Sequence, residues 1–99
     1  MAATLLASAG LVLGLSAEAQ AAQGEFVYAT NDGVSRTFVN PPNNTCMFFE
    51  FAAEAALNST NTRARVYTGI TCSGPSSDVQ PGGSLSTGTN NLNSVEFIP

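Results

Sequence analysis

Short apolar segments, each ended by residues that favour turns, constrain the fold of this chain more than any other feature. From residue 25 onward they alternate with clusters of Gly, Pro, Asn, Ser and Thr. Strands need only a few residues and tolerate such frequent interruption, whereas stable helices need longer uninterrupted stretches. The spacing predicts an all-β fold, a small antiparallel sandwich of Greek-key type.

The first expected pair of strands is a hairpin. Residues 25–30 alternate aromatic and smaller side chains and predict a strand. Asn31-Asp32-Gly33 supplies residues that tolerate a positive φ angle, which is typical of a tight hairpin turn. Residues 34–39 are the expected returning strand, and it ends at Pro41 and Pro42, because proline cannot donate a ladder hydrogen bond.

The middle of the chain is more ambiguous. Residues 46–51 form an apolar run that predicts a strand, with three large side chains on one face and Phe48 on the other, so we expect it to be buried on both faces. Residues 52–57 are rich in Ala and Glu and predict a short helix. Residues 58–61 are polar and predict a turn.

Three further strands are expected. Residues 62–68 alternate, with alanine and valine on the inner face, and residues 78–80 form a short candidate. Residues 94–98 predict the final strand, with Phe97 pointing inward and Glu96 outward.

The first two dozen residues read as an export signal. Residues 5–15 are almost wholly apolar, and Ala17-Glu18-Ala19 and Ala19-Gln20-Ala21 both offer the small-x-small pattern of a cleavage site. A membrane anchor is the alternative, but a run of about eleven residues is shorter than the roughly twenty that a spanning helix needs. No Lys or Arg precedes the run, so either the amino terminus supplies the positive charge alone or the true start lies upstream. We expect a signal peptide over residues 1–21, a single secreted, extracellular domain over 22–99, and no membrane association after cleavage.

The two cysteines, Cys46 and Cys72, predict a disulfide, because export exposes them to an oxidising environment. Closing the ring between them removes unfolded-chain entropy worth about 3.5 kcal/mol. A reactive thiol is the alternative, but the chain has no CxxC motif and no histidine to lower a thiol pKa.

Composition argues against several functional classes. Three arginines and no lysine are too few for a nucleic-acid surface. The absence of histidine removes the common nucleophilic triads and the His-containing zinc sites. A domain this small also has little room for a substrate cleft. We therefore expect a monomer that is not an enzyme and holds no cofactor, calcium being the one exception considered below.

The segment over about residues 67–98 carries a family resemblance. The segment begins with Tyr67-Thr68-Gly69-Ile70-Thr71-Cys72-Ser73-Gly74, has Ser84 in a later hairpin, and closes with Ser94-Val95-Glu96-Phe97. This pattern resembles a Greek-key motif of the βγ-crystallin-like families, with Cys72 where an aromatic residue usually stands. Small exported proteins of soil actinobacteria are similar over more of the chain, and some crystallin-like members of that group inhibit metallopeptidases. No comparable motif stands out in residues 25–51, so a second Greek key is inferred there.

The resemblance implies a binding protein, and specifically an inhibitor of an extracellular peptidase. The candidate inhibitory loop contains Gly69, Ile70, Thr71, Ser73 and Gly74, and residues 81–93 are a second candidate. The alternative is a structural or stress-related domain of the cell envelope, with a cell-surface ligand as its partner. A secreted toxin is a third class, although such toxins often need a cationic surface that this chain lacks.

Many microbial crystallin-like domains bind calcium, and a degenerate form of their motif occurs at residues 90–94. Asn90, Asn91 and Ser94 match ligand positions, but Val95 stands where a final serine belongs. Calcium needs six to eight oxygen ligands, usually with carboxylate charge, and the segment supplies no carboxylate before Glu96. A polar turn is the competing interpretation.

Overall fold

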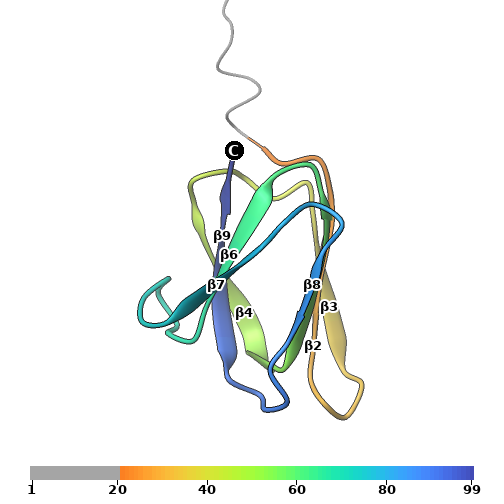
Figure 1. The fold of residues 1–99 in the computed structure, drawn as a ribbon, viewed down its shortest axis with the longest axis vertical. Helices are drawn as coiled ribbons and strands as arrows, with labels where there is room; N and C mark the ends of the chain where they lie inside the picture. Colours follow the sequence, from red (N-terminus) through yellow and green to blue (C-terminus); the bar gives the residue numbers. More distant parts are fainter. Residues whose placement is uncertain (1–20) are drawn as a thin grey trace, which may run out of the picture.

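The computed structural model describes residues 21–99, and these form eight strands and no helix. The strands are β2 (Gly24–Ala29), β3 (Ser35–Val39), β4 (Cys46–Ala53), β5 (Ala55–Thr60), β6 (Arg63–Tyr67), β7 (Ser76–Val79), β8 (Ser84–Ser86) and β9 (Leu92–Ile98). They make two antiparallel sheets with the orders β3-β2-β5-β8 and β4-β9-β6-β7, packed face to face (Figure 1). The small Greek-key sandwich predicted from the sequence is confirmed.

The predicted signal peptide lies outside the described residues, apart from Ala21 at its end. Ala21 bridges to Pro42, and the Ala22 amide donates to the Pro41 carbonyl at 2.8 Å. Within residues 21–99, no helix is long and apolar enough to cross a membrane.

The chain builds two Greek keys of four strands each, β2–β5 and β6–β9. In each unit the fourth strand returns beside the first, so that β5 pairs with β2 and β9 with β6. The third strand of each unit leaves it and completes the other sheet, since β4 pairs with β9 and β8 with β5. The two units are therefore interlocked, and neither sheet is complete without a strand from the other unit.

Two expectations for the middle of the chain were wrong. Residues 52–57 are not helical, and the turn expected at 58–61 begins only after Thr60, because both stretches contribute to β5. This strand is paired on both sides, by β2 and β8, and such pairing outweighs the helix propensity of alanine and glutamate. Its polar Asn58 is fully buried, and the Asn58 side-chain amide donates to the carbonyls of Thr62 and Val79 at 2.9 Å each.

The expectation that β4 is buried on both faces was also wrong. β4 is an edge strand, and Phe48, on its outer face, is 62% exposed. The opposite side packs against the core through Met47, Phe49 and Phe51.

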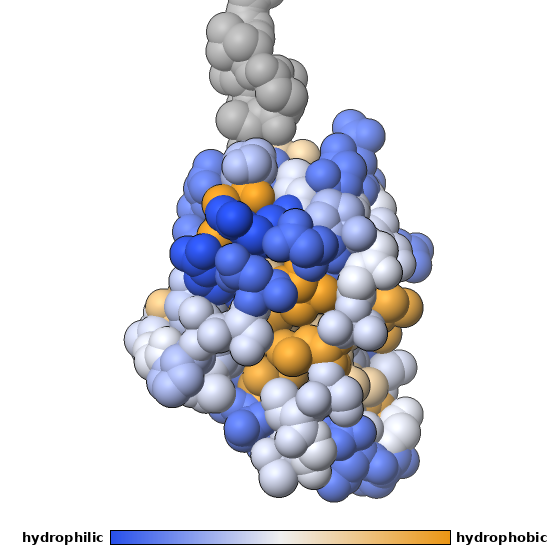
Figure 2. Space-filling model, in the orientation of Figure 1, coloured by the Kyte–Doolittle hydropathy of each residue, from blue (hydrophilic) through white to orange (hydrophobic). Residues whose placement is uncertain are grey.

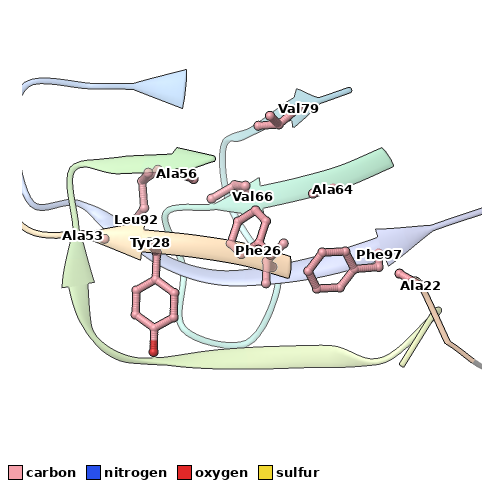
Figure 3. Packing of buried hydrophobic residues seen from close by; sticks show 11 residues of the cluster. Ala22, Phe26, Tyr28, Ala53, Ala56, Ala64, Val66, Val79, Leu92 and Phe97 are labelled. Carbon is pink, nitrogen blue, oxygen red and sulfur yellow. The ribbon is translucent and has the colours of Figure 1, made fainter. Parts of the chain in front are cut away.

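The core lies between the two inner faces of the sandwich. Phe26 of β2 and Phe97 of β9 meet edge to face with ring centroids 5.3 Å apart, and Figure 3 shows them facing each other from opposite sheets. Tyr28 stacks on Phe49 at 4.0 Å. The inward positions predicted in residues 62–68 and 94–98 are confirmed, because Ala64, Val66, Val95 and Phe97 are all buried. Burying each large apolar side chain contributes about 1.5–3 kcal/mol.

Candidate functional site

The connection between β6 and β7, residues 68–75, stands out from the outer face of the β4-β9-β6-β7 sheet (Figure 1). We call it the Cys72 loop. Two backbone hydrogen bonds close its base, from the Thr68 amide to the Pro75 carbonyl at 3.0 Å and from the Gly69 amide to the Ser73 carbonyl at 2.9 Å. All five residues of the predicted inhibitory loop lie within the outer of these two closures, between Thr68 and Pro75.

A disulfide joins Cys72 to Cys46, as the sequence predicted, and their Cα atoms are 5.9 Å apart. Cys46 begins β4, which comes from the first Greek-key unit. The bond therefore ties the loop of one unit to a strand of the other.

Ser94, in the sheet beneath the loop, holds the loop in place. It is fully buried in β9, and its hydroxyl donates to the Gly69 carbonyl at 2.5 Å while accepting from the Cys72 amide at 2.9 Å. The side-chain amide of the neighbouring Asn93 donates to the Thr68 carbonyl at 2.8 Å. These bonds hold both halves of the loop to the sheet.

Two glycines make the loop path possible. A Cβ atom on Gly69 would lie 2.4 Å from the Ser73 carbonyl oxygen, a distance at which the backbone must shift. Gly74 has a φ angle of +80°, in the left-handed region that favours glycine. Both positions belong to the motif on which the family resemblance rests.

The loop presents an apolar tip. Ile70 is 68% exposed, the largest exposure among the large hydrophobic residues in the described part of the chain. Phe48, at 62%, lies next to the loop, because it is aligned with Ser94 across β4 and β9. Ile70 and Phe48 are therefore both exposed on the side of the sheet that carries the Cys72 loop.

The sequence analysis missed Phe48 as a site residue, although a signal for it exists. Residues two apart in a strand share a face, so Phe48 must lie on the same face as Cys46. Since Cys46 is bonded to Cys72, that face is the one that carries the loop.

Charged side chains flank the loop but do not belong to it. Arg65 donates two hydrogen bonds to Asp78, at 2.8 and 3.2 Å. These bonds hold the pKa of the Asp78 carboxyl below its usual range and raise the pKa of Arg65. Tyr67 donates to Glu96 at 3.4 Å. The loop itself, residues 68–75, contains no charged side chain.

The residues considered for calcium lie in three separate hydrogen-bond arrangements. The Asn90 side-chain oxygen accepts from the Asn31 amide at 3.1 Å, and that of Asn91 accepts from the Thr87 hydroxyl at 2.9 Å. Ser94 anchors the Cys72 loop, as described above. Across residues 21–99, no three Asp, Glu, His or Cys side chains gather into a metal-binding group.

The second candidate stretch, residues 81–93, is divided by β8. In its later part the Thr87 hydroxyl donates to the Glu54 carbonyl and to the Asn91 side-chain oxygen. None of the exposed large hydrophobic residues lies in it. The Cys72 loop is therefore the better-formed candidate of the two.

No protein-family model, curated protein or solved structure matches this chain.

Proposed function

We propose that this protein is a secreted binding domain that inhibits an extracellular peptidase by placing the Cys72 loop in its active site. One observation carries the proposal. Ile70 is 68% exposed on a loop whose backbone is held by a disulfide and by a buried serine. A large apolar side chain exposed on a fixed loop is a preorganised anchor, and little ordering entropy is lost when it binds.

The loop geometry accounts for inhibition rather than cleavage. A substrate loop leaves the active site once its bond is cut, because the two new ends separate. Here Gly69 is held to Ser94 on one side of Ile70, and Cys72 is held to Ser94 and to Cys46 on the other. Both ends would stay in place after a cut, so the bond could re-form and the loop would remain bound.

The chemistry of the loop selects the class of peptidase. Ile70 suits an apolar specificity pocket, whereas a trypsin-type pocket carries a carboxylate that requires Lys or Arg. The loop has neither residue. The resemblance to exported crystallin-like inhibitors supports a metallopeptidase as the target. Phe48 would contact the rim of the active site beside the loop.

An inhibition panel tests the proposal. The oxidised domain, residues 22–99, is titrated against a thermolysin-type metallopeptidase, a subtilisin-type peptidase and a trypsin-type peptidase. We expect stoichiometric inhibition of one of the first two, with a dissociation constant below about 1 µM, and none of the trypsin type.

Matched variants locate the inhibitory surface. Ile70→Asp should weaken inhibition at least about 100-fold, since it places a charge in an apolar pocket. Val39→Asp is the control, because Val39 is similarly exposed, at 63%, but lies on the other sheet. Equal inhibition by both variants, or no inhibition by the folded wild type, would overturn the proposal. The second result would favour the structural role at the cell envelope.

A further inference from the structure

The peptide bond between Gly69 and Ile70 lies at the exposed end of the Cys72 loop. Ile70 is 68% exposed, and Figure 2 shows pale surface at the left margin of the molecule, where the loop projects in Figure 1. Residues 68–75 contain no charged side chain that would repel a peptidase. Neither burial nor charge therefore keeps this bond away from an enzyme that binds Ile70.

Hydrolysis of this bond requires an accessible Gly69 carbonyl. Water adds its oxygen to the carbonyl carbon, the bond to the Ile70 nitrogen breaks, and that nitrogen takes both protons of the water. The step is slow unless a metal ion or hydrogen-bond donors of the peptidase bind the carbonyl oxygen, because negative charge develops there. The direction in which the Gly69 carbonyl points therefore decides whether the bond can be cut.

In the Cys72 loop this carbonyl points toward the sheet. The Ser94 hydroxyl donates to it at 2.5 Å, and Ser94 is fully buried in β9. The Gly69 amide is occupied as well, because it donates to the Ser73 carbonyl at 2.9 Å. The Ser73 backbone also crowds the glycine, since a Cβ atom on Gly69 would lie 3.0 Å from the Ser73 carbonyl carbon. Both backbone polar groups of Gly69 are thus engaged within the domain.

The first Greek-key unit indicates that the sandwich does not need a hydroxyl group at this place. Tyr67, the last residue of β6, is aligned with Ser94, and the corresponding pair in the first unit is Ala29 with Ala55. Alanine is sufficient there, beside the short turn of residues 30–34. The hydroxyl of Ser94 therefore serves the loop and not the packing of the sheets.

We infer that Ser94 protects the Gly69–Ile70 bond from hydrolysis. A thermolysin-type metallopeptidase binds an apolar residue on the amine side of the bond that it cuts, so it would take up Ile70 and find the Gly69 carbonyl turned away from its metal ion. Such an enzyme holds the loop without cleaving it. This inference rests on the proposed function and narrows its target class to these metallopeptidases. The following bond, Ile70–Thr71, depends on the tethering described above.

Incubation of the oxidised domain with a thermolysin-type metallopeptidase tests the inference. A cut at Gly69–Ile70 leaves two fragments joined by the Cys46–Cys72 disulfide, so the intact mass rises by one water and reduction separates the fragments. The wild type should keep this bond. Ser94→Ala should be cut there at least about tenfold faster, because the Gly69 carbonyl is released from the sheet.

Asn93→Ala is the matched control. The Asn93 side chain holds the adjacent carbonyl, that of Thr68, at 2.8 Å, so this variant loosens the same half of the loop and keeps the bond from Ser94 to Gly69. Its rate of cleavage at Gly69–Ile70 should stay close to that of the wild type. Circular dichroism verifies that both variants fold.

Two results would overturn the inference. One is an equal rate of cleavage at Gly69–Ile70 in the wild type and Ser94→Ala, whether both are cut quickly or both resist. The other is cleavage of Asn93→Ala there as fast as Ser94→Ala, which would indicate general loosening of the loop. Cleavage is measured without any measurement of inhibition, so a wild type that resists cleavage but does not inhibit would contradict the proposed function alone.

Discussion

The two Greek-key units join their first and second strands in different ways, and the contrast supports the proposed role of the second connection. In the first unit, residues 30–34 make a tight turn in which the Thr30 amide donates to the Val34 carbonyl at 2.8 Å and Gly33 has a φ of +95°. In the second unit, residues 68–75 form the longer Cys72 loop. The first unit demonstrates that the fold needs only a tight turn at this place. The additional residues of the loop are therefore available for binding.

The supports of the two connections differ as well. The turn is stabilised by its own backbone and by the Thr30 hydroxyl, which donates to Asp32, and its one distant support is the Asn90 side chain, which bonds to Asn31. The loop depends on distant residues, since Cys46, Asn93 and Ser94 all hold it to the sheet. Changes at these supports should therefore separate the stability of the fold from the function of the loop.

The largest effect is expected from removing the disulfide. The Cys46→Ala, Cys72→Ala double variant should lose about 2–5 kcal/mol of unfolding free energy, because the unfolded chain regains the entropy of an open ring. Urea denaturation measures the loss, and the reduced wild type should show a similar one. A loss below about 1 kcal/mol would mean that the ring contributes little to stability.

The next effect concerns Ser94. Ser94→Ala should cost about 1–3 kcal/mol and weaken inhibition, because the Cys72 amide and the Gly69 carbonyl lose their common partner. The opposite change at the corresponding place in the first unit, Ala55→Ser, should be nearly neutral for stability and for inhibition. If Ser94→Ala leaves inhibition unchanged, the loop does not depend on this anchor.

A pair of glycine variants gives a smaller effect and compares the connections directly. Gly33→Ala and Gly74→Ala should each cost about 1 kcal/mol, because both residues have positive φ angles. Only Gly74→Ala should also reduce inhibition, since only Gly74 lies in the Cys72 loop. A parallel loss of inhibition in Gly33→Ala would contradict the assignment of the site.

The smallest effect is the pH dependence that arises from Asp78. Its pKa is lower in the folded state, because Arg65 donates two hydrogen bonds to its carboxylate. The stabilisation is therefore fully present above the ordinary pKa of Asp and is lost as the pH falls below about 4. The difference in melting temperature between the wild type and Asp78→Asn should shrink through that range. A constant difference from pH 7 to pH 2 would exclude this origin.

Local patterns were enough to predict much of the fold. Strand alternation located the inner faces of β6 and β9, the Asn31-Asp32-Gly33 turn indicated the first hairpin, and export with two cysteines indicated the disulfide. The error over residues 52–57 has a physical cause. This stretch has helical propensity, but its first two residues end β4 and residues 55–57 begin β5, which pairs with β2 and β8, strands distant in sequence.

The candidate site was predictable in part. The loop around Cys72 was predicted from its tether at that cysteine, but the positions of Phe48 and Ser94 beside it depend on how β4 and β9 align beneath it. That alignment joins residues from different Greek-key units, so a local sequence pattern does not predict it. Ser94, which the sequence analysis considered as a calcium ligand, instead holds the Cys72 loop, because its place in β9 lies beneath that loop.

A loop exchange tests the central claim, that the Cys72 loop is the inhibitory surface, most directly. Residues 68–75 are replaced by the sequence of residues 30–34, and Cys46→Ser removes the unpaired thiol. Inhibition of the peptidase identified by the panel is then titrated against the wild type, with circular dichroism to verify the sandwich. We predict a folded domain that no longer inhibits. Undiminished inhibition by the folded exchange variant would contradict the account.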